Sequence, residues 1–381
     1  MAPRGASRRL REGAVGAAAS LLGRLARPGH VPAPPDPSAV QRLLVVKPCC
    51  LGDVLMATPA VRALATHYPN ARIDVVTTTW SAPALRGNPR VARVIPYPDR
   101  PASPRMLSLA RSLRRARYDL AVGLDPSPLV NGLLWLTGAP VRAGIDSQGR
   151  GIGLTHPAPL VPSHHETETY LDVLAALGVP AAGTAPEYYL SEDARRTGAA
   201  IVPDGSPPTV VIHPGGAVNP GTAMPAKRWP PERFAALADR LAAKAGVRVL
   251  LVGAASDRAA VAAVVRAARA PVVNLCGRLA LEQLAGVIAR AALYVGNDSG
   301  VSHLAAAVGT PTVTIFGPTN PGRYRPLGAR ARVCAPPESW HGALVDLRRG
   351  SAPATSVERV TVDMVAAACL DLLGAASEGG A

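Results

Sequence analysis

The sequence predicts an α/β protein with two doubly wound, Rossmann-like domains, each a parallel sheet covered by helices on both faces. Short runs of consecutive apolar residues, as at 43–46 and 210–212, are typical of strands buried on both faces. Helical patterns alternate with these runs, and such alternation implies parallel strands joined by helices. The alternation stops near residue 180 and restarts near 210, and a chain of 381 residues has room for about two domains.

The first domain is predicted over residues 39–190. The Tyr-Pro-Asn stretch at 68–70 ends its first helix, and Gly178 caps the end of its last helix. The Gly-rich stretch 144–153 is interpreted as a turn between elements. The predicted strands are 43–46, 72–77, 91–95 and 118–124, and the predicted helices are 53–67, 102–117 and 170–177.

The second domain is predicted over residues 191–350. Pro231 begins its first helix and Gly246 follows its end, which are the usual positions of these residue types. A last helix, 362–373, is predicted within the tail 351–381. The predicted strands are 210–213, 247–252, 272–275, 292–295 and 312–316, and the other predicted helices are 231–245, 256–268, 281–290 and 301–308.

Residues 1–38 form a basic N-terminal extension. Its arginines flank a weak run of Ala and Gly, and a Pro-rich linker follows at 31–37. No A-x-A site follows the apolar run, which disfavours a signal peptide. We expect a segment that is disordered in water, and that either touches an anionic membrane surface or is a featureless extension.

The net charge of +15 indicates a partner that carries phosphate groups. Nine arginines but only one acidic residue, Asp99, lie between Arg86 and Arg117. Tyr97 is the only aromatic residue in that stretch, and no nucleic-acid motif is present, so nucleic acid is disfavoured as the partner. No apolar run approaches the ~20 residues of a membrane-spanning helix.

The five cysteines are scattered and odd in number. They form no CxxC motif and no Cys/His pair at metal-ligand spacing. We therefore expect reduced thiols and a cytoplasmic protein.

The turn after strand 43–46 carries one carboxylate, Asp53. Open α/β folds bind ligands at the carboxyl ends of their strands, so this turn faces a candidate site. Asp53 is interpreted either as a helix cap or as a functional group. Two such domains facing each other would place a cleft between them. The absence of G-x-G-x-x-G after the first strand of either domain disfavours a nicotinamide or flavin enzyme.

The strongest motif of the second half is the stretch 296–307, which follows a buried strand and opens a helix. Backbone N–H groups at Ser299 and Gly300 suit a phosphate, because the start of a helix is positive and glycine permits close approach. Asp298 fits either hydrogen bonding to sugar hydroxyls or a helix cap. His303, about one turn further on, either lines the same cleft or is a buried structural histidine.

Two more loops of the second half are candidate ligand sites. The loop that begins His213-Pro214-Gly215-Gly216 contains Lys227 beside Trp229, which should anchor it. Lys227 and its neighbour Arg228 offer positive charge without a metal, or are a solvated pair. Thr319, in the loop 316–321, either contacts a phosphate or belongs to a plain turn.

Five motifs together resemble glycosyltransferase family 9, the ADP-heptose-dependent heptosyltransferases. The resemblance covers residues 42 to about 330. It implies a GT-B fold with facing domains, and an inverting, metal-independent transfer from an ADP-sugar to a glycan, a lipid-linked core or a metabolite. The motifs are Gly52–Pro59, His213–Gly215, Lys227–Pro230, Asp298–His303 and Phe316–Thr319.

The resemblance also implies roles for single residues. Asp53 becomes the base that deprotonates the acceptor, and Asp298 holds hydroxyls of the donor sugar. The second domain binds the donor and the first binds the acceptor. The donor residues are Lys227, Asp298, Ser299, Gly300, His303, Thr319, His213 and Gly215.

The acceptor side is predicted from basic residues. Lys47 stands where the family has an arginine, and Arg111, Arg114 and Arg115 suit a phosphorylated, lipid-linked acceptor. A solvated basic helix face is the alternative for these three arginines. Competing functions are a GT-B-like epimerase or hydrolase, a transferase for another nucleotide-sugar, and a binding protein with a degenerate site. Contact with the inner face of the plasma membrane is a further expectation.

Overall fold

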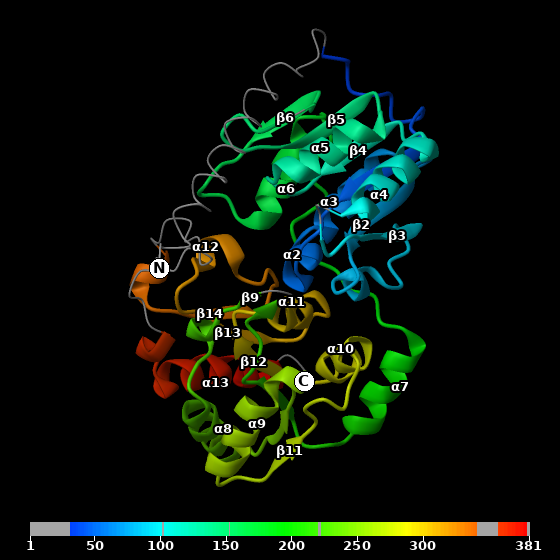
Figure 1. Ribbon diagram of the computed structural model, residues 1–381. Helices are drawn as coiled ribbons and strands as arrows, with labels where there is room; N and C mark the ends of the chain where they lie inside the picture. The colour runs from blue at the N-terminus through cyan, green and yellow to red at the C-terminus, as the bar shows by residue number, and fades with distance from the viewer. Residues whose placement is uncertain (1–30, 101–102, 152, 220–221, 341–356, 379–381) are drawn as a thin grey trace. The chain divides into compact units, whose positions relative to one another are not determined.

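The computed structural model describes residues 31–100, 103–151, 153–219, 222–340 and 357–378 (Figure 1). Most of the predicted N-terminal extension, residues 1–30, therefore lies outside the described residues. The chain divides into two compact units. The first contains residues as far as 49 together with 57–82 and 88–184, and the second contains 50–56, 83–87 and the chain from 185 onward.

The first unit contains a parallel sheet in the order β3-β2-β1-β4-β5-β6. This is the Rossmann order, in which the strand order reverses between the first and fourth strands. The crevice at that reversal, beyond the carboxyl ends of β1 and β4, is where such sheets bind ligands. The strands are β1 (Arg42–Val46), β2 (Arg72–Thr78), β3 (Arg93–Tyr97), β4 (Leu120–Gly123), β5 (Val141–Asp146) and β6 (His156–Pro159).

Helices of the first unit pack on this sheet through apolar side chains. Leu113 of α4 and Leu133 of α5 join Leu44 and Val46 of β1 in one buried cluster. The helices are α3 (Thr58–His67), α4 (Pro104–Ala116), α5 (Pro128–Thr137) and α6 (Glu166–Ala175).

Three elements of the first unit, α5, β5 and β6, were not predicted. The stretch 144–153, interpreted as a turn, begins inside β5, so that interpretation was wrong at its start. Arg142, Gly144 and Asp146 give β5 no continuous apolar run. A Cβ on Gly144 would lie 3.0 Å from Leu154, so the glycine there serves packing within the sheet layer.

The predicted helix 53–67 is two helices, α2 (Leu51–Met56) and α3 (Thr58–His67). Pro59 has no N–H to continue the hydrogen-bond ladder of α2, but it fits the first turn of α3. The break also separates the two helices by unit, because α2 groups with the second unit and α3 with the first.

The second unit repeats the same strand order, β11-β10-β7-β12-β13-β14, with all pairs parallel. The order reverses between β7 and β12, which pair directly. The strands of this sheet are β7 (Thr209–His213), β10 (Arg248–Leu251), β11 (Val272–Asn274), β12 (Leu293–Asn297), β13 (Thr312–Ile315) and β14 (Ala331–Cys334). A small antiparallel pair, β8 (Val218–Asn219) with β9 (Thr222–Ala223), lies in the long loop after β7.

Two buried apolar clusters hold the second unit together, and the larger one includes residues of α8 and α13. Trp229 and Phe234 are buried in it, and their rings meet edge to face at 4.9 Å. Val365 and Cys369 of α13 enter the same core, so the last helix belongs to this unit. The helices are α2, α7 (Glu192–Ile201), α8 (Pro231–Ala245), α9 (Arg258–Ala267), α10 (Leu281–Ala289), α11 (Gly300–Ala307), α12 (Pro321–Tyr324) and α13 (Val362–Glu378).

The prediction of two parallel-sheet α/β domains is confirmed. In the second unit α7, α12, β8, β9 and β14 were not predicted. Among the described residues, no helix combines the length and the apolar character needed to cross a membrane.

Candidate functional site

Three loops of the second unit meet at one edge of its sheet. They follow β7, β12 and β13, which are neighbours and run parallel. Their carboxyl ends therefore lie side by side at the point where the strand order reverses. The predicted motifs at His213, Asp298 and Thr319 all follow these strands, so the fold gathers them in one place.

Lys227, Asp298 and Thr319 form a buried polar cluster. The Lys227 Nζ lies 2.7 Å from Asp298 Oδ2, and the Thr319 hydroxyl donates to the same oxygen at 2.5 Å. The Lys227 side chain is 12% exposed and that of Asp298 is 7% exposed. A buried ion pair is tolerated when further hydrogen bonds satisfy it, and Thr319 supplies one. Lys227, which we predicted to bind the donor, is therefore already paired with Asp298.

Asn297 ties both ends of the long loop after β7 to the end of β12, and sequence reasoning missed it. Its amide donates to the carbonyls of Pro214 and Gly215 at 3.1 and 3.0 Å. Its side-chain oxygen accepts the Trp229 N–H at 3.0 Å. Asn297 has no exposed surface. An asparagine that ends a buried strand was the only available signal, and it does not reveal which loops the side chain bridges.

Asp257 holds the loop that begins at His213. Sequence reasoning also missed this residue. One oxygen accepts the Gly216 N–H at 3.0 Å, and the other accepts the Ala254 N–H at 2.9 Å and lies 3.3 Å from His213 Nε2. Burial acts to raise the pKa of Asp257, but His213 and the two N–H groups outweigh it and lower that pKa to about 2. Asp257 is thus an anion that organises the loop.

The same contacts give His213 and Gly215 structural reasons to be where they are. Besides its contact with Asp257, the buried His213 ring places Nδ1 3.4 Å from the Tyr294 hydroxyl. A Cβ on Gly215 would lie 2.2 Å from Asp257 Cγ, so only glycine fits there. These two predicted donor residues hold the loop that carries the site.

Asp53 lies in α2, which packs against α11 through two glycines. A Cβ on Gly52 would lie 2.8 Å from the His303 ring, and one on Gly300 would lie 2.9 Å from Leu51 Cβ. Because α2 begins at Leu51, Asp53 stands in the first helical turn rather than at the cap. Within the described residues its carboxylate makes no hydrogen bond.

His303 stands among the charged residues of the site. Burial lowers its pKa, while the charges of Asp298 and Asp53 act to raise it and that of Lys227 acts to lower it. The charges of all three residues therefore act on the imidazole, and burial, the largest effect, favours its neutral form. In the described part of the chain, its buried Nδ1 has no hydrogen-bond partner.

On the first unit, Lys47 lies at the carboxyl end of β1. The side chain is buried, with Nζ 3.3 Å from Asp125 Oδ2 and 5.1 Å from the centre of the Tyr170 ring. Asp125 follows β4, so this pair occupies the reversal point of the first sheet.

The structure does not bring Arg111, Arg114 and Arg115 to Lys47. All three side chains are exposed on α4. Arg114 lines a surface hollow together with Tyr118, Gly138 and Pro140, which lie close before β4 and β5. The hollow is therefore at the amino ends of the strands, the edge opposite Lys47.

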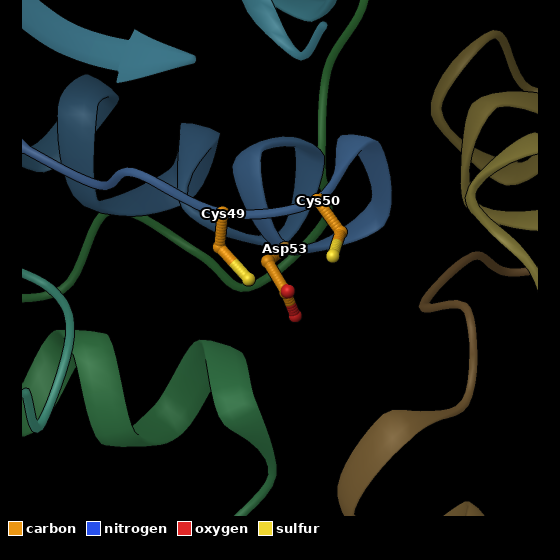
Figure 2. A group of neighbouring side chains, drawn as sticks. All are labelled: Cys49, Cys50 and Asp53. Carbon is orange, nitrogen blue, oxygen red and sulfur yellow. The ribbon is translucent and has the colours of Figure 1, made fainter. Parts of the chain in front are cut away.

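A group of possible metal ligands that the sequence did not predict lies at the start of α2. The donor atoms of Cys49, Cys50 and Asp53 all lie within 4.8 Å of one another (Figure 2). Two thiols and a carboxylate are a donor set that a soft divalent cation accepts. Sequence spacing rules missed the group because adjacent cysteines match no common metal motif.

Comparisons with known proteins agree with these motifs. Residues 106–347 match the family model described as "Glycosyltransferase family 9 (heptosyltransferase)". The chain is 32% identical over 311 residues to lipopolysaccharide heptosyltransferase 2 of Salmonella typhimurium, covering 77% of this chain and 87% of that protein. It is 31% identical over 330 residues to the enzyme of the same name from Escherichia coli K12, covering 82% and 91%.

Solved structures show the same architecture. The structure of E. coli ADP-heptose lps heptosyltransferase II matches with a TM-score of 0.71 and 28% identity, over 88% of this chain and 100% of that one. A glycosyltransferase family 9 structure from Veillonella parvula matches with a TM-score of 0.76 at 23% identity, over 90% and 99%. The second likeness bears on the fold alone.

Proposed function

The chain belongs to glycosyltransferase family 9 and is a glycosyltransferase, and we propose that it transfers heptose from ADP-heptose to a hydroxyl of a lipopolysaccharide core. The names of the similar enzymes support this donor and acceptor. The observation that carries the proposal is the convergence of Asp53, Asp298, Lys227 and His303 at the start of α11. A binding protein with a degenerate site would not need to keep all four.

The donor diphosphate is proposed to bind at the start of α11. The helix begins at Gly300, and its Ser299 cap makes no side-chain hydrogen bond to the helix. The first backbone N–H groups of a helix have no partner within the helix, and they lie at the positive end of its dipole. Lys227 and Thr319, which contact Asp298, supply a cation and a hydroxyl beside them. Asp298 then takes sugar hydroxyls, because a carboxylate repels phosphate.

We propose an inverting reaction that needs no metal. The Asp53 carboxylate takes the proton of the acceptor hydroxyl as its oxygen attacks the anomeric carbon. The bond from that carbon to the diphosphate breaks on the opposite face, and ADP leaves with the electron pair. Lys227 and the N–H groups of α11 stabilise the charge that develops on ADP.

A surface on the first unit is proposed to contact anionic lipid. Helices α4 and α5 pack together, and α4 exposes Arg111, Arg114 and Arg115. The two helices also expose large apolar side chains, which is the combination that binds a lipid interface. The apolar residues are Leu107, Leu129, Trp135 and Leu136. A cytoplasmic location, at the inner face of the plasma membrane, is part of this proposal.

The proposed function is tested with a panel of nucleotide-sugars, measured by calorimetry and by release of the nucleotide. We expect tight binding and turnover only with ADP-heptose, and turnover that persists in EDTA. Preference for a uridine or guanosine donor would refute the donor assignment. Nucleotide release that needs no acceptor, with no glycan product, would favour the hydrolase or epimerase alternative.

A further inference from the structure

Three metal-ligand side chains converge beside α2. Two Sγ atoms and one carboxylate oxygen, from Cys49, Cys50 and Asp53, lie within 4.8 Å of one another, and all three residues are partly buried. Figure 2 shows the three side chains projecting toward the same side of the turn. The reaction proposed above uses Asp53 but neither cysteine.

The local backbone holds this arrangement. The Cys50 carbonyl accepts the Val54 N–H at 3.1 Å, so Cys50 begins the helical turn on which Asp53 stands three residues later. Residues three apart lie on one face of a helix. The Cys49 carbonyl accepts hydrogen bonds from the Thr78 and Ser81 hydroxyls. These hydrogen bonds fix the backbone that carries the three metal-ligand side chains. Only rotation of the side chains is then needed to bring the ligand atoms closer together.

The donor chemistry selects a soft or borderline cation. Thiolates bind zinc and cadmium well and magnesium or calcium poorly. A tetrahedral zinc with Zn–S near 2.3 Å and Zn–O near 2.1 Å separates its ligand atoms by about 3.7 Å. Donors within 4.8 Å reach that separation by small rotations of the side chains. Three protein ligands leave a fourth position for water.

We propose that Cys49, Cys50 and Asp53 chelate a divalent cation of the zinc and cadmium class, and that the occupied site inhibits sugar transfer. Binding deprotonates both thiols and releases two protons to solvent. The cation also takes the carboxylate lone pairs of Asp53, so that carboxylate no longer accepts a proton. The inhibitory part rests on the proposed function, in which Asp53 is the base, whereas the binding part does not.

Binding is tested on the full-length protein, kept reduced and stripped of metal with a chelator. Titration with Co²⁺ and with Cd²⁺ should produce thiolate-to-metal charge-transfer absorption that saturates at one ion per chain. Cys49→Ser and Cys50→Ser should each weaken binding by about 100-fold or more, because each removes a ligand where even supporting groups are worth 10–100-fold. Cys276→Ser is the control, since Cys276 is also partly buried but lies at another place in the fold.

The charge-transfer absorption shows whether the cation binds at Cys49 and Cys50, and it does not depend on any measurement of catalysis. Absence of a charge-transfer band in the wild type would overturn the proposal. A band that survives the Cys49 and Cys50 substitutions, or that disappears in Cys276→Ser, would do the same. Circular dichroism of each variant establishes that it is folded before its affinity is compared.

Inhibition is tested in the transfer assay, where each variant is compared with itself in the absence of metal. The Cd²⁺ concentration that halves transfer should equal the Cd²⁺ dissociation constant from the titration, and both should rise together in Cys50→Ser. Metal binding with undiminished transfer would overturn the inhibitory part alone. A protein that binds metal but never uses ADP-heptose would refute the proposed function and leave the metal site standing.

Discussion

The Asp53 carboxylate is the group on which the proposed reaction most directly depends. Asp53→Asn keeps the shape of the side chain but removes its basicity. Transfer should fall by about 10²–10⁴-fold, the usual contribution of a general base, with ADP-heptose affinity nearly unchanged. Single-turnover rates and calorimetry measure the two effects. Asp363→Asn on α13, a mostly exposed aspartate, is the matched control. Near-normal turnover in Asp53→Asn would remove Asp53 as the base.

Substitution of Lys227, another single residue, tests the proposed binding of the nucleotide-sugar. Lys227→Ala removes a cation 2.7 Å from Asp298 and leaves that carboxylate as an unpaired buried charge. Donor affinity should fall by about 10–100-fold, because charge-assisted hydrogen bonds to the diphosphate are worth ~1.5–3 kcal/mol. Calorimetry with ADP measures this change, and thermal unfolding shows whether the fold also suffers. Lys244→Ala on α8 removes an exposed lysine as a control. Unchanged ADP affinity would contradict the phosphate role.

At the scale of elements, two glycines let α2 and α11 approach each other. Gly52→Ala would place a Cβ 2.8 Å from the His303 ring, so either that ring or α2, which carries Asp53, must shift. We expect a stability loss of ~1–3 kcal/mol, the usual cost of overpacking, and a larger proportional loss of kcat than of donor affinity. Urea unfolding and steady-state kinetics measure both.

Gly374→Ala is the control for this pair, because its added Cβ meets no atom within 4 Å. In the helix α13, alanine there should be neutral or stabilising, since glycine is the poorer helix former. Equal effects of the two substitutions would argue against close packing between α2 and α11.

The α4–α5 surface makes its own prediction. Arg111→Ala combined with Arg115→Ala should weaken sedimentation with phosphatidylglycerol vesicles by roughly 30-fold, since each arginine near an anionic surface contributes ~1 kcal/mol. Binding should also fall at high salt. Arg266→Ala with Arg269→Ala removes two exposed arginines of the second unit as a control. Equal binding to phosphatidylcholine vesicles would contradict the electrostatic basis.

At the scale of the whole molecule, Asp257 links stability to pH. Its folded pKa, about 2, is below the unfolded value near 3.9, so the unfolded chain binds more protons between these values. The stabilisation, ~2 kcal/mol, is therefore complete above about pH 4 and is lost as pH falls toward 2. The difference in unfolding free energy between wild type and Asp257→Asn should shrink accordingly when urea unfolding is measured from pH 6 to 2.5.

Asp204→Asn serves as the control for this experiment, because Asp204 is almost fully exposed. Its effect on the unfolding free energy should vary little with pH. A pH-independent difference between wild type and Asp257→Asn would show that the carboxylate is not held ionised by His213 and the loop N–H groups.

Much of the fold was readable from local pattern. The range of α8 was predicted to the residue, because Pro231 and Gly246 mark its ends and the apolar positions repeat with helical spacing. Strands such as β5 and β14 were missed because their side chains alternate or are polar, so no continuous apolar run marks them. The break between α2 and α3 was not predicted. Pro59 is compatible with the first turn of a helix, but the sequence alone does not show that a new helix begins there.

The sequence by itself determined the two parallel-sheet domains and the motifs at the carboxyl ends of their strands. The spacing of apolar residues and the Pro and Gly residues at the ends of elements are local properties of a chain. Only the tertiary structure showed that Asn297 joins the end of β12 to the loop after β7, that Asp257 holds the His213 loop, and that Lys227 pairs with Asp298. These contacts join residues 41 to 83 positions apart, and no local pattern specifies such pairings. The cysteine–carboxylate group likewise depends on side-chain directions that the backbone sets.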